Sequence, residues 1–279
     1  MKSMGGMRRR WMAAVIALGL SACGAGGRDR RGPAHDLGSS APTDGGAVPE
    51  QPTVYYVYAH DDTTLYKIDP DTLTITPVGA FVWPQSSDQM TDIAIDKQGQ
   101  MVGISFDKVY SVDKDTAVCT YLADLDRSFN SLSFVPADLI DGSSGKEVLV
   151  AAATDGSFYQ IDPMTGHSTQ LGSYGSSLSS SGDIVSVTGF GTVATAKQPG
   201  GTEDWIVRVD PNTGAATLLG NTHTADIWGL GFWKNKIFGF TQGGVFVLLD
   251  DKTGAATVVQ SGTIAWWGAA VSTAAPVIQ

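Results

Sequence analysis

Five side chains with binding chemistry stand at comparable places in the sequence, each at the start of a short run of β-forming residues. They are two carboxylates, one amide and two indoles: Asp92, Asn130, Asp183, Trp228 and Trp267. Aromatic rings stack on the apolar face of a sugar, and carboxylates or amides bind hydroxyl groups. If the five runs lie side by side, the set predicts a binding surface for a carbohydrate or another small molecule. The competing interpretation is structural: the polar groups bond loop amides, and the Trp-Gly pairs pack between sheets.

The two aspartates also suggest one reaction. A pair of carboxyl groups facing each other across a channel can act as the acid and base of a glycosidase, so a hydrolase or lactonase is a further alternative. Other support for catalysis is lacking, because the sequence has no G-x-S-x-G element and its histidines lack metal-binding spacing. We predict no catalytic residue, no metal site and no cofactor. His60, beside Asp61-Asp62, is expected in a solvated hairpin turn.

A recurring phrase indicates the elements that would position these residues. Its clearest copy, residues 158–166 (Phe-Tyr-Gln-Ile-Asp-Pro-Met-Thr-Gly), is an alternating strand followed by a turn. The five copies place their aspartates 44, 49, 48 and 40 residues apart, at Asp69, Asp113, Asp162, Asp210 and Asp250. We expect each carboxylate to accept backbone N–H groups of its turn. Calcium binding at residues 69–71 or 113–115 is the alternative use of these acids.

The repeat length and the strand count predict a propeller. Two further β-rich runs precede most copies of the phrase, which makes four strands per repeat and five repeats. The first copy, beginning at Thr53, lacks its opening strand, and the chain finishes with an unpartnered opening strand, residues 267–271. We therefore predict an all-β, five-bladed β-propeller over residues 53–279, in which the C-terminal strand completes the first blade. The repeats resemble those of bacterial propellers of the YVTN and quinoprotein-like kind, a resemblance that implies the fold but no catalytic motif.

The N-terminal residues are typical of an exported lipoprotein. Residues 1–22 combine a basic start with a short apolar run, and they end in Leu-Ser-Ala before Cys23. This sequence resembles the lipobox of bacterial lipoproteins, which implies cleavage before Cys23 and acylation of its thiol, for example with palmitate. Residues 23–52 are rich in Gly, Ser, Pro and Ala, so we expect a disordered tether. The resemblance implies a cell-envelope location, on the outer membrane facing the periplasm or the cell surface.

The net charge limits the classes of possible partner, and the sequence has only one cysteine besides Cys23. The net charge of −10 argues against nucleic acid as a partner. Cys119, which would be the sole thiol left after acylation of Cys23, is expected to pack as a small apolar side chain. We expect a monomer that serves first as a protein-interaction or scaffold module of the envelope, and alternatively as a binder of glycans or small molecules. Three polar loops are further candidates for specificity: residues 136–146, 173–182 and 198–204.

Overall fold

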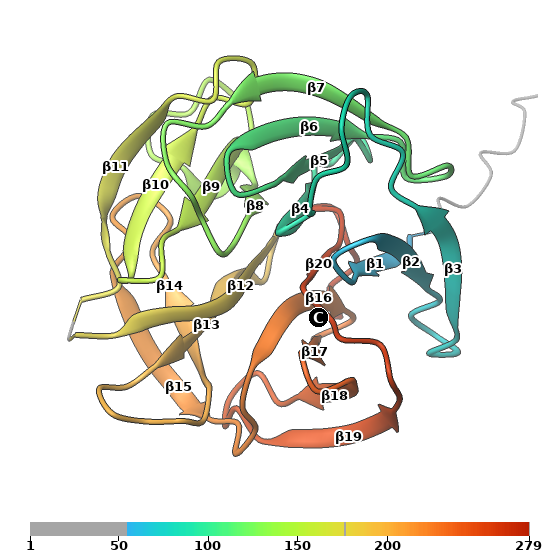
Figure 1. The fold of residues 1–279 in the computed structure, drawn as a ribbon. Coiled ribbons are helices and arrows are strands. Elements are labelled where there is room, and N and C mark those ends of the chain that lie inside the picture. The colour runs from blue at the N-terminus through green and yellow to red at the C-terminus, as the bar shows by residue number, and fades with distance from the viewer. Residues whose placement is uncertain (1–54, 176, 279) are drawn as a thin grey trace, which may run out of the picture. The chain divides into compact units, whose positions relative to one another are not determined.

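The computed structural model describes residues 55–175 and 177–278, which form five antiparallel sheets of four strands around a central axis (Figure 1). The predictions for residues 1–22, Cys23 and residues 23–52 lie outside the described residues. The strands of each blade are given from the axis outward. The first blade consists of β20 (Gly268–Ala270), β1 (Val57–His60), β2 (Thr64–Ile68) and β3 (Ile75–Ala80), and the second of β4 (Asp92–Ile95), β5 (Met101–Ile104), β6 (Lys108–Val112) and β7 (Cys119–Asp124). The third blade consists of β8 (Ser133–Val135), β9 (Val148–Ala152), β10 (Ser157–Ile161) and β11 (Ser168–Ser173), the fourth of β12 (Ser179–Val187), β13 (Gly191–Lys197), β14 (Trp205–Val209) and β15 (Ala216–Asn221), and the fifth of β16 (Ile227–Trp233), β17 (Lys236–Thr241), β18 (Val245–Leu249) and β19 (Ala256–Ser261). The predicted five-bladed propeller is confirmed.

The C-terminal strand closes the ring. Strand β20 pairs antiparallel with β1, with Ala59 opposite Ala269, so the first and last strands belong to one blade. The expected closure is therefore confirmed, although the first strand begins at Val57 instead of at Thr53. Closure matters because an open ring would leave a sheet edge and a blade face exposed to water. One short 3-10 helix, η1 (Ala137–Leu139), is the only helix in the described part of the chain, which contains no helix able to span a membrane.

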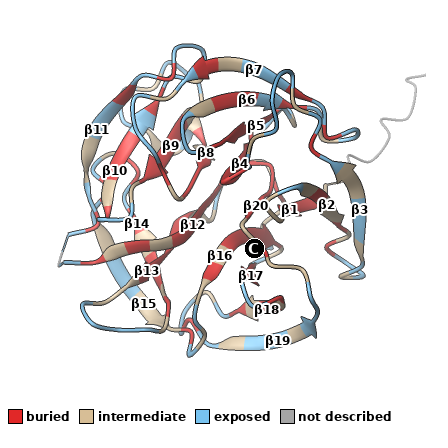
Figure 2. Ribbon diagram, viewed as in Figure 1, coloured by how far each residue is buried: buried red, intermediate tan, exposed pale blue. Residues whose placement is uncertain are grey.

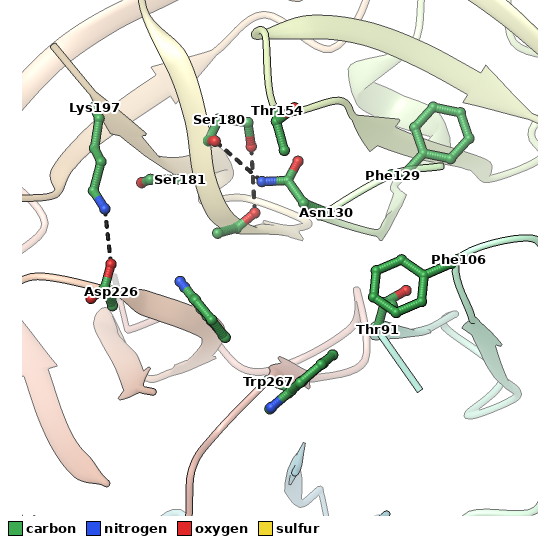
Figure 3. A pocket seen from close by; sticks show the side chains of 12 residues that line it. Thr91, Phe106, Phe129, Asn130, Thr154, Ser180, Ser181, Lys197, Asp226 and Trp267 are labelled. Carbon is green, nitrogen blue, oxygen red and sulfur yellow. Dashed lines mark hydrogen bonds and ion pairs between the residues drawn. The ribbon is translucent and has the colours of Figure 1, made fainter. Parts of the chain in front are cut away.

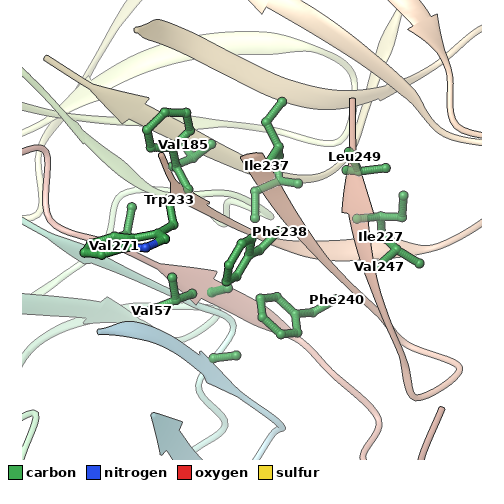
Figure 4. Packing of buried hydrophobic residues seen from close by; sticks show 14 of the residues in the cluster. Val57, Val185, Ile227, Trp233, Ile237, Phe238, Phe240, Val247, Leu249 and Val271 are labelled. Carbon is green, nitrogen blue, oxygen red and sulfur yellow. The ribbon is translucent and has the colours of Figure 1, made fainter. Parts of the chain in front are cut away.

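Burial decreases from the axis to the rim (Figure 2). The innermost strands β4, β12, β16 and β20 are almost wholly buried, whereas the fourth strand of each blade is largely exposed or half-buried. The largest apolar cluster joins side chains of three neighbouring blades, including Val57, Val185 and Phe238 (Figure 4). Cys119 packs in a second cluster, as expected, and burial raises its pKa to about 12.

The repeated aspartates build the outer hairpins. Asp69 Oδ1 accepts the N–H groups of Asp71 and Thr72 at 3.0 and 2.9 Å, and Asp250 Oδ1 accepts two turn N–H groups in the same way. These backbone hydrogen bonds hold the pKa of Asp69 and of Asp250 below the usual range. The expected turn chemistry is confirmed.

One turn position requires glycine for two reasons. Gly166 has a φ of +68°, and a Cβ there would lie 1.9 Å from the carbonyl oxygen of Asp124 in the neighbouring blade. Gly200 has a similar φ of +71° but faces open space. Alanine substitutions at these two glycines therefore distinguish the free-energy cost of backbone strain from that of a steric clash.

We predict that Gly200→Ala lowers the free energy of unfolding by about 1 kcal/mol, the cost of a left-handed non-glycine residue. Gly166→Ala should cost roughly 3 kcal/mol or more, because the blade contact must also open. Urea denaturation of both variants measures the difference. Equal losses would contradict the proposed contact between blades.

Candidate functional site: the mouth of the central channel

Three of the five predicted site residues line one pocket. A cavity of about 400 Å³ opens where the inner strands begin, and Asn130, Trp228 and Trp267 are among its lining residues (Figure 3). Asn130 precedes β8, while Trp228 lies in β16 and Trp267 directly precedes β20. The pocket therefore collects side chains from several blades at one end of the channel. Asp92 and Asp183 do not line it.

One wall of the pocket is aromatic. The ring centroids of Trp228 and Trp267 lie 6.0 Å apart with their planes at 88°. Phe106, from the β5–β6 turn, lies 6.4 Å from Trp267 at 77° and is 51% exposed. Both indoles are half-buried, which leaves part of each ring open to the pocket. Three rings at steep angles to one another form a corner with apolar faces.

A second part of the lining, the charged wall, is polar and charged. Lys197, at the end of β13, donates from Nζ to Asp226 Oδ1 at 2.9 Å, and Nζ also lies 3.7 Å from Asp204 Oδ1. Asp204 is fully buried behind the lysine, where burial raises its pKa to about 6. The Asn130 amide closes the wall by donating from Nδ2 to the carbonyl oxygen of Ser180 at 3.1 Å. The pocket thus combines an aromatic corner with one lysine and one carboxyl group, and a second carboxyl group, that of Asp204, lies behind the lysine.

Asp92 and Asp183 lie deeper in the channel because of their strand register. Asp92 faces Ile104 across β4 and β5, and the corresponding positions in two other blades are Gly229 and Gly268. The tryptophans come one residue earlier, at the pocket. A Cβ at Gly268 would lie 2.4 Å from Asp92 Oδ1, so glycine there makes room for the carboxyl group.

The Asp183 carboxylate binds three blades together. Its Oδ1 accepts the N–H of Ile184 in its own strand at 2.6 Å. Its Oδ2 accepts the N–H of Leu230 in β16 at 2.6 Å and that of Ala269 in β20 at 3.3 Å. Because the residue is fully buried, these donors take the place of water around the charge.

Asp92 completes the network by sharing a proton with Asp183. Asp92 accepts the N–H of Ile93 at 2.8 Å and also hydrogen-bonds the backbone of Leu132, which precedes β8. Burial raises the pKa of Asp92 well above its usual range, and the adjacent Asp183 raises it further. Burial also raises the pKa of Asp183, but hydrogen bonds from Asp92 and from backbone N–H groups oppose that rise. Because burial and Asp183 both raise the pKa of Asp92, whereas hydrogen bonds hold that of Asp183 to about 8, the shared proton stays on Asp92 to the higher pH.

This arrangement does not resemble a glycosidase centre. The two carboxyl groups of glycosidases stand roughly 5 Å or more apart, with the scissile bond between them, whereas Asp92 and Asp183 are hydrogen-bonded and closed to solvent. In the described part of the chain, no group of three His, Cys, Asp or Glu side chains is placed to hold a metal ion.

His60 differs from its expected place. It is fully buried at the end of β1, not in a solvated turn, and burial lowers its pKa to about 4. Nδ1 donates to the carbonyl oxygen of Asp61 at 2.7 Å, which makes Nε2 the acceptor nitrogen. A Cβ at Gly268 would lie 2.5 Å from Nε2, so the imidazole packs beside the carboxyl pair. The turn starts only at Asp61, whose carboxylate accepts the N–H groups of Thr63 and Thr64.

Sequence reasoning missed the charged wall and Phe106. Lys197 and Asp226 occupy different positions in their blades, so alignment of the repeats does not bring them together. One signal was available for Phe106, because a large aromatic residue inside a polar two-strand turn is unusual. Of the three candidate loops, residues 173–182 contribute Ser180, Ser181 and Gly182 to the pocket, although β12 already begins at Ser179.

Comparisons with known proteins assign this chain to no family. No family model matches the sequence, and no curated protein matches it. One similar solved structure is a symmetrical protein described in terms of de novo evolutionary emergence, at 17% identity and a TM-score of 0.48, covering 81% of this chain and 100% of the other. Another is a protein of unknown function from Bacteroides caccae, at 10% identity and a TM-score of 0.42, covering 76% and 73%. Neither likeness bears on function.

We predict that Asp92→Asn changes how stability depends on pH. Folded Asp92 keeps its proton at pH values where the unfolded carboxyl, with a pKa of about 3.9, has lost it. Through this one group, raising the pH destabilises the wild type by up to about 1.4 kcal/mol per unit until the raised pKa of Asp92 is passed. Asparagine still donates to Asp183 but cannot titrate, so the variant should gain stability relative to wild type from pH 5 to pH 8.

Urea denaturation at four pH values between 5 and 8 checks this. Asp183→Asn is the contrasting variant, because its amide group would meet the N–H donors of Leu230 and Ala269. It should lose roughly 2 kcal/mol or more throughout that range. Parallel stability curves for wild type and Asp92→Asn would contradict the shared proton.

Proposed function

We propose that this propeller binds a small ligand, in the first place a carbohydrate, at the mouth of its channel. The observation that carries the proposal is the half-exposed indole pair of Trp228 and Trp267, held at 88° on one wall of a pocket of about 400 Å³. Pockets of this size enclose one or two rings, and indole faces stack on sugar rings. The charged wall supplies hydrogen-bonding groups for hydroxyls.

The sequence-based role as a protein-interaction or scaffold module of the envelope is the alternative. It draws on the broad, rigid faces of the propeller. The pocket is the more specific feature, and we rank ligand binding first for that reason. A resemblance to the YVTN and quinoprotein-like propellers is compatible with either role.

The proposed setting is the bacterial cell envelope, with the propeller held by lipid on Cys23. This part of the proposal rests on the lipobox-like residues 20–23 and the composition of residues 23–52. A tethered binding domain could sample ligands near the membrane while remaining a monomer.

We expect saturable changes in tryptophan fluorescence when the purified protein is titrated with envelope glycans and cell-wall fragments. Replacing Trp228 or Trp267 by alanine should weaken binding at least about fivefold, since stacked aromatic contacts contribute roughly 1 kcal/mol or more each. Trp205→Phe, on β14 outside the pocket, is the matched control and should bind like wild type. No response from a folded protein across the panel would count against ligand binding.

The anchor is tested separately. Expressed in a bacterial host, the wild-type protein should fractionate with membranes and incorporate labelled palmitate. Cys23→Ser should lose the label and appear in the soluble fraction, because the acylated thiol is gone. Membrane association that survives the substitution would refute the lipid anchor at this cysteine.

A further inference from the structure

The charges around the pocket restrict the ligand that the proposed site would take. Lys197 and Asp226 are the charged side chains that line it, with side chains 26% and 46% exposed. Asp204 adds a second carboxyl group behind the lysine, 3.7 Å from its Nζ. At neutral pH one positive charge therefore faces two negative ones.

The lysine is not available for an anion. Its Nζ already donates to Asp226 Oδ1 at 2.9 Å, and Asp204 draws it toward the wall. An acidic ligand would have to displace the Asp226 carboxylate from the lysine. That carboxylate would then be left unpaired near the buried Asp204. Asp226, in contrast, has capacity to spare: within the described residues, only Oδ1 takes a hydrogen bond, and Oδ2 is available to a donor.

The aromatic wall favours a positive ligand as well. Indole and phenyl faces attract ammonium groups through their ring quadrupoles. Trp228, Trp267 and Phe106 present such faces at steep angles, so a cation in the corner contacts more than one ring. The net charge of −10 would also draw cations toward the protein.

From these contacts we infer that the pocket selects an organic ammonium ligand: a protonated amine carried next to an apolar face, as in an amino sugar or a cycloalkylamine. The ammonium group would donate to Asp226 Oδ2, and the apolar face would stack on Trp228 or Trp267. This inference rests on the proposed ligand binding and specifies the chemistry of that same site.

The test compares matched ligands that differ mainly in charge. The protein is titrated separately with glucosamine, glucose and glucuronate, and with cyclohexylamine and cyclohexanol. Tryptophan fluorescence and calorimetry are the readouts. Each amine should bind roughly tenfold more tightly than its neutral partner, and glucuronate should bind more weakly than glucose. The advantage of the amines should shrink with added salt, because the Asp226 side is partly exposed. Tighter binding of glucosamine than of cyclohexylamine would identify a sugar as the source of the amine.

Two variants assign the preference to the charged wall. Asp226→Asn should remove the amine advantage while neutral ligands bind as before, and asparagine tolerates the left-handed φ of +57° at this position. Lys197→Met should instead strengthen amine binding severalfold, because the Asp226 carboxylate loses its counter-charge and no competing ammonium group remains in the pocket. Asp138→Asn, in η1 beyond the far end of β8, is the control with the same change of charge.

The outcomes separate this inference from the proposed function. Equal binding of amines and neutral partners, lost in the tryptophan variants, would overturn the inference and leave the binding site standing. Preference for glucuronate, or weaker amine binding in Lys197→Met, would also overturn it. No binding of any ligand would remove both.

Discussion

The structure depends on a buried carboxyl pair at the point where five blades meet. Inner strands that converge on one axis leave backbone N–H groups without water, and each needs an acceptor. The Asp183 carboxylate accepts from its own blade and from those of Leu230 and Ala269, while Asp92 accepts from its own blade and bonds the backbone of Leu132. One shared proton joins the two, so the pair touches all five blades. Two adjacent charges without water would be prohibitive, which makes that proton part of the architecture.

The carboxyl pair also determines the shape of the cavity at the mouth of the channel. The Asp92 carboxyl group fills the space left by glycine at position 268, and the buried pair forms a closed layer of the channel next to the pocket. Residues one step earlier in the same strands, Trp228 and Trp267, face the pocket instead of the axis. A small, one-ended cavity with fixed walls results, in place of an open pore. That geometry suits binding of a small ligand better than a reaction between the two aspartates.

The repeats made the blade predictable, because its hairpins require an aspartate and a left-handed residue at fixed places. How deep each candidate residue lies in the channel was not predictable from its place in the sequence repeat. Successive residues of a strand point to opposite sides, so a one-residue offset moved Asp92 and Asp183 into the axis while Asn130, Trp228 and Trp267 line the pocket. The charged wall around Lys197 was missed because it comes from contacts between blades that follow no period.

Infrared spectroscopy of the folded protein tests the central claim most directly. A carboxyl group that keeps its proton in a dry interior has a carbonyl stretch distinct from those of ionised carboxylates. At pH 9, above the pKa of about 8 of Asp183, the account predicts one such band, insensitive to brief transfer into D2O, present in the wild type and absent from Asp92→Asn. A wild-type spectrum without this band would mean that both carboxyl groups are ionised, and it would contradict the shared proton on which the assembly of the five blades is argued to depend.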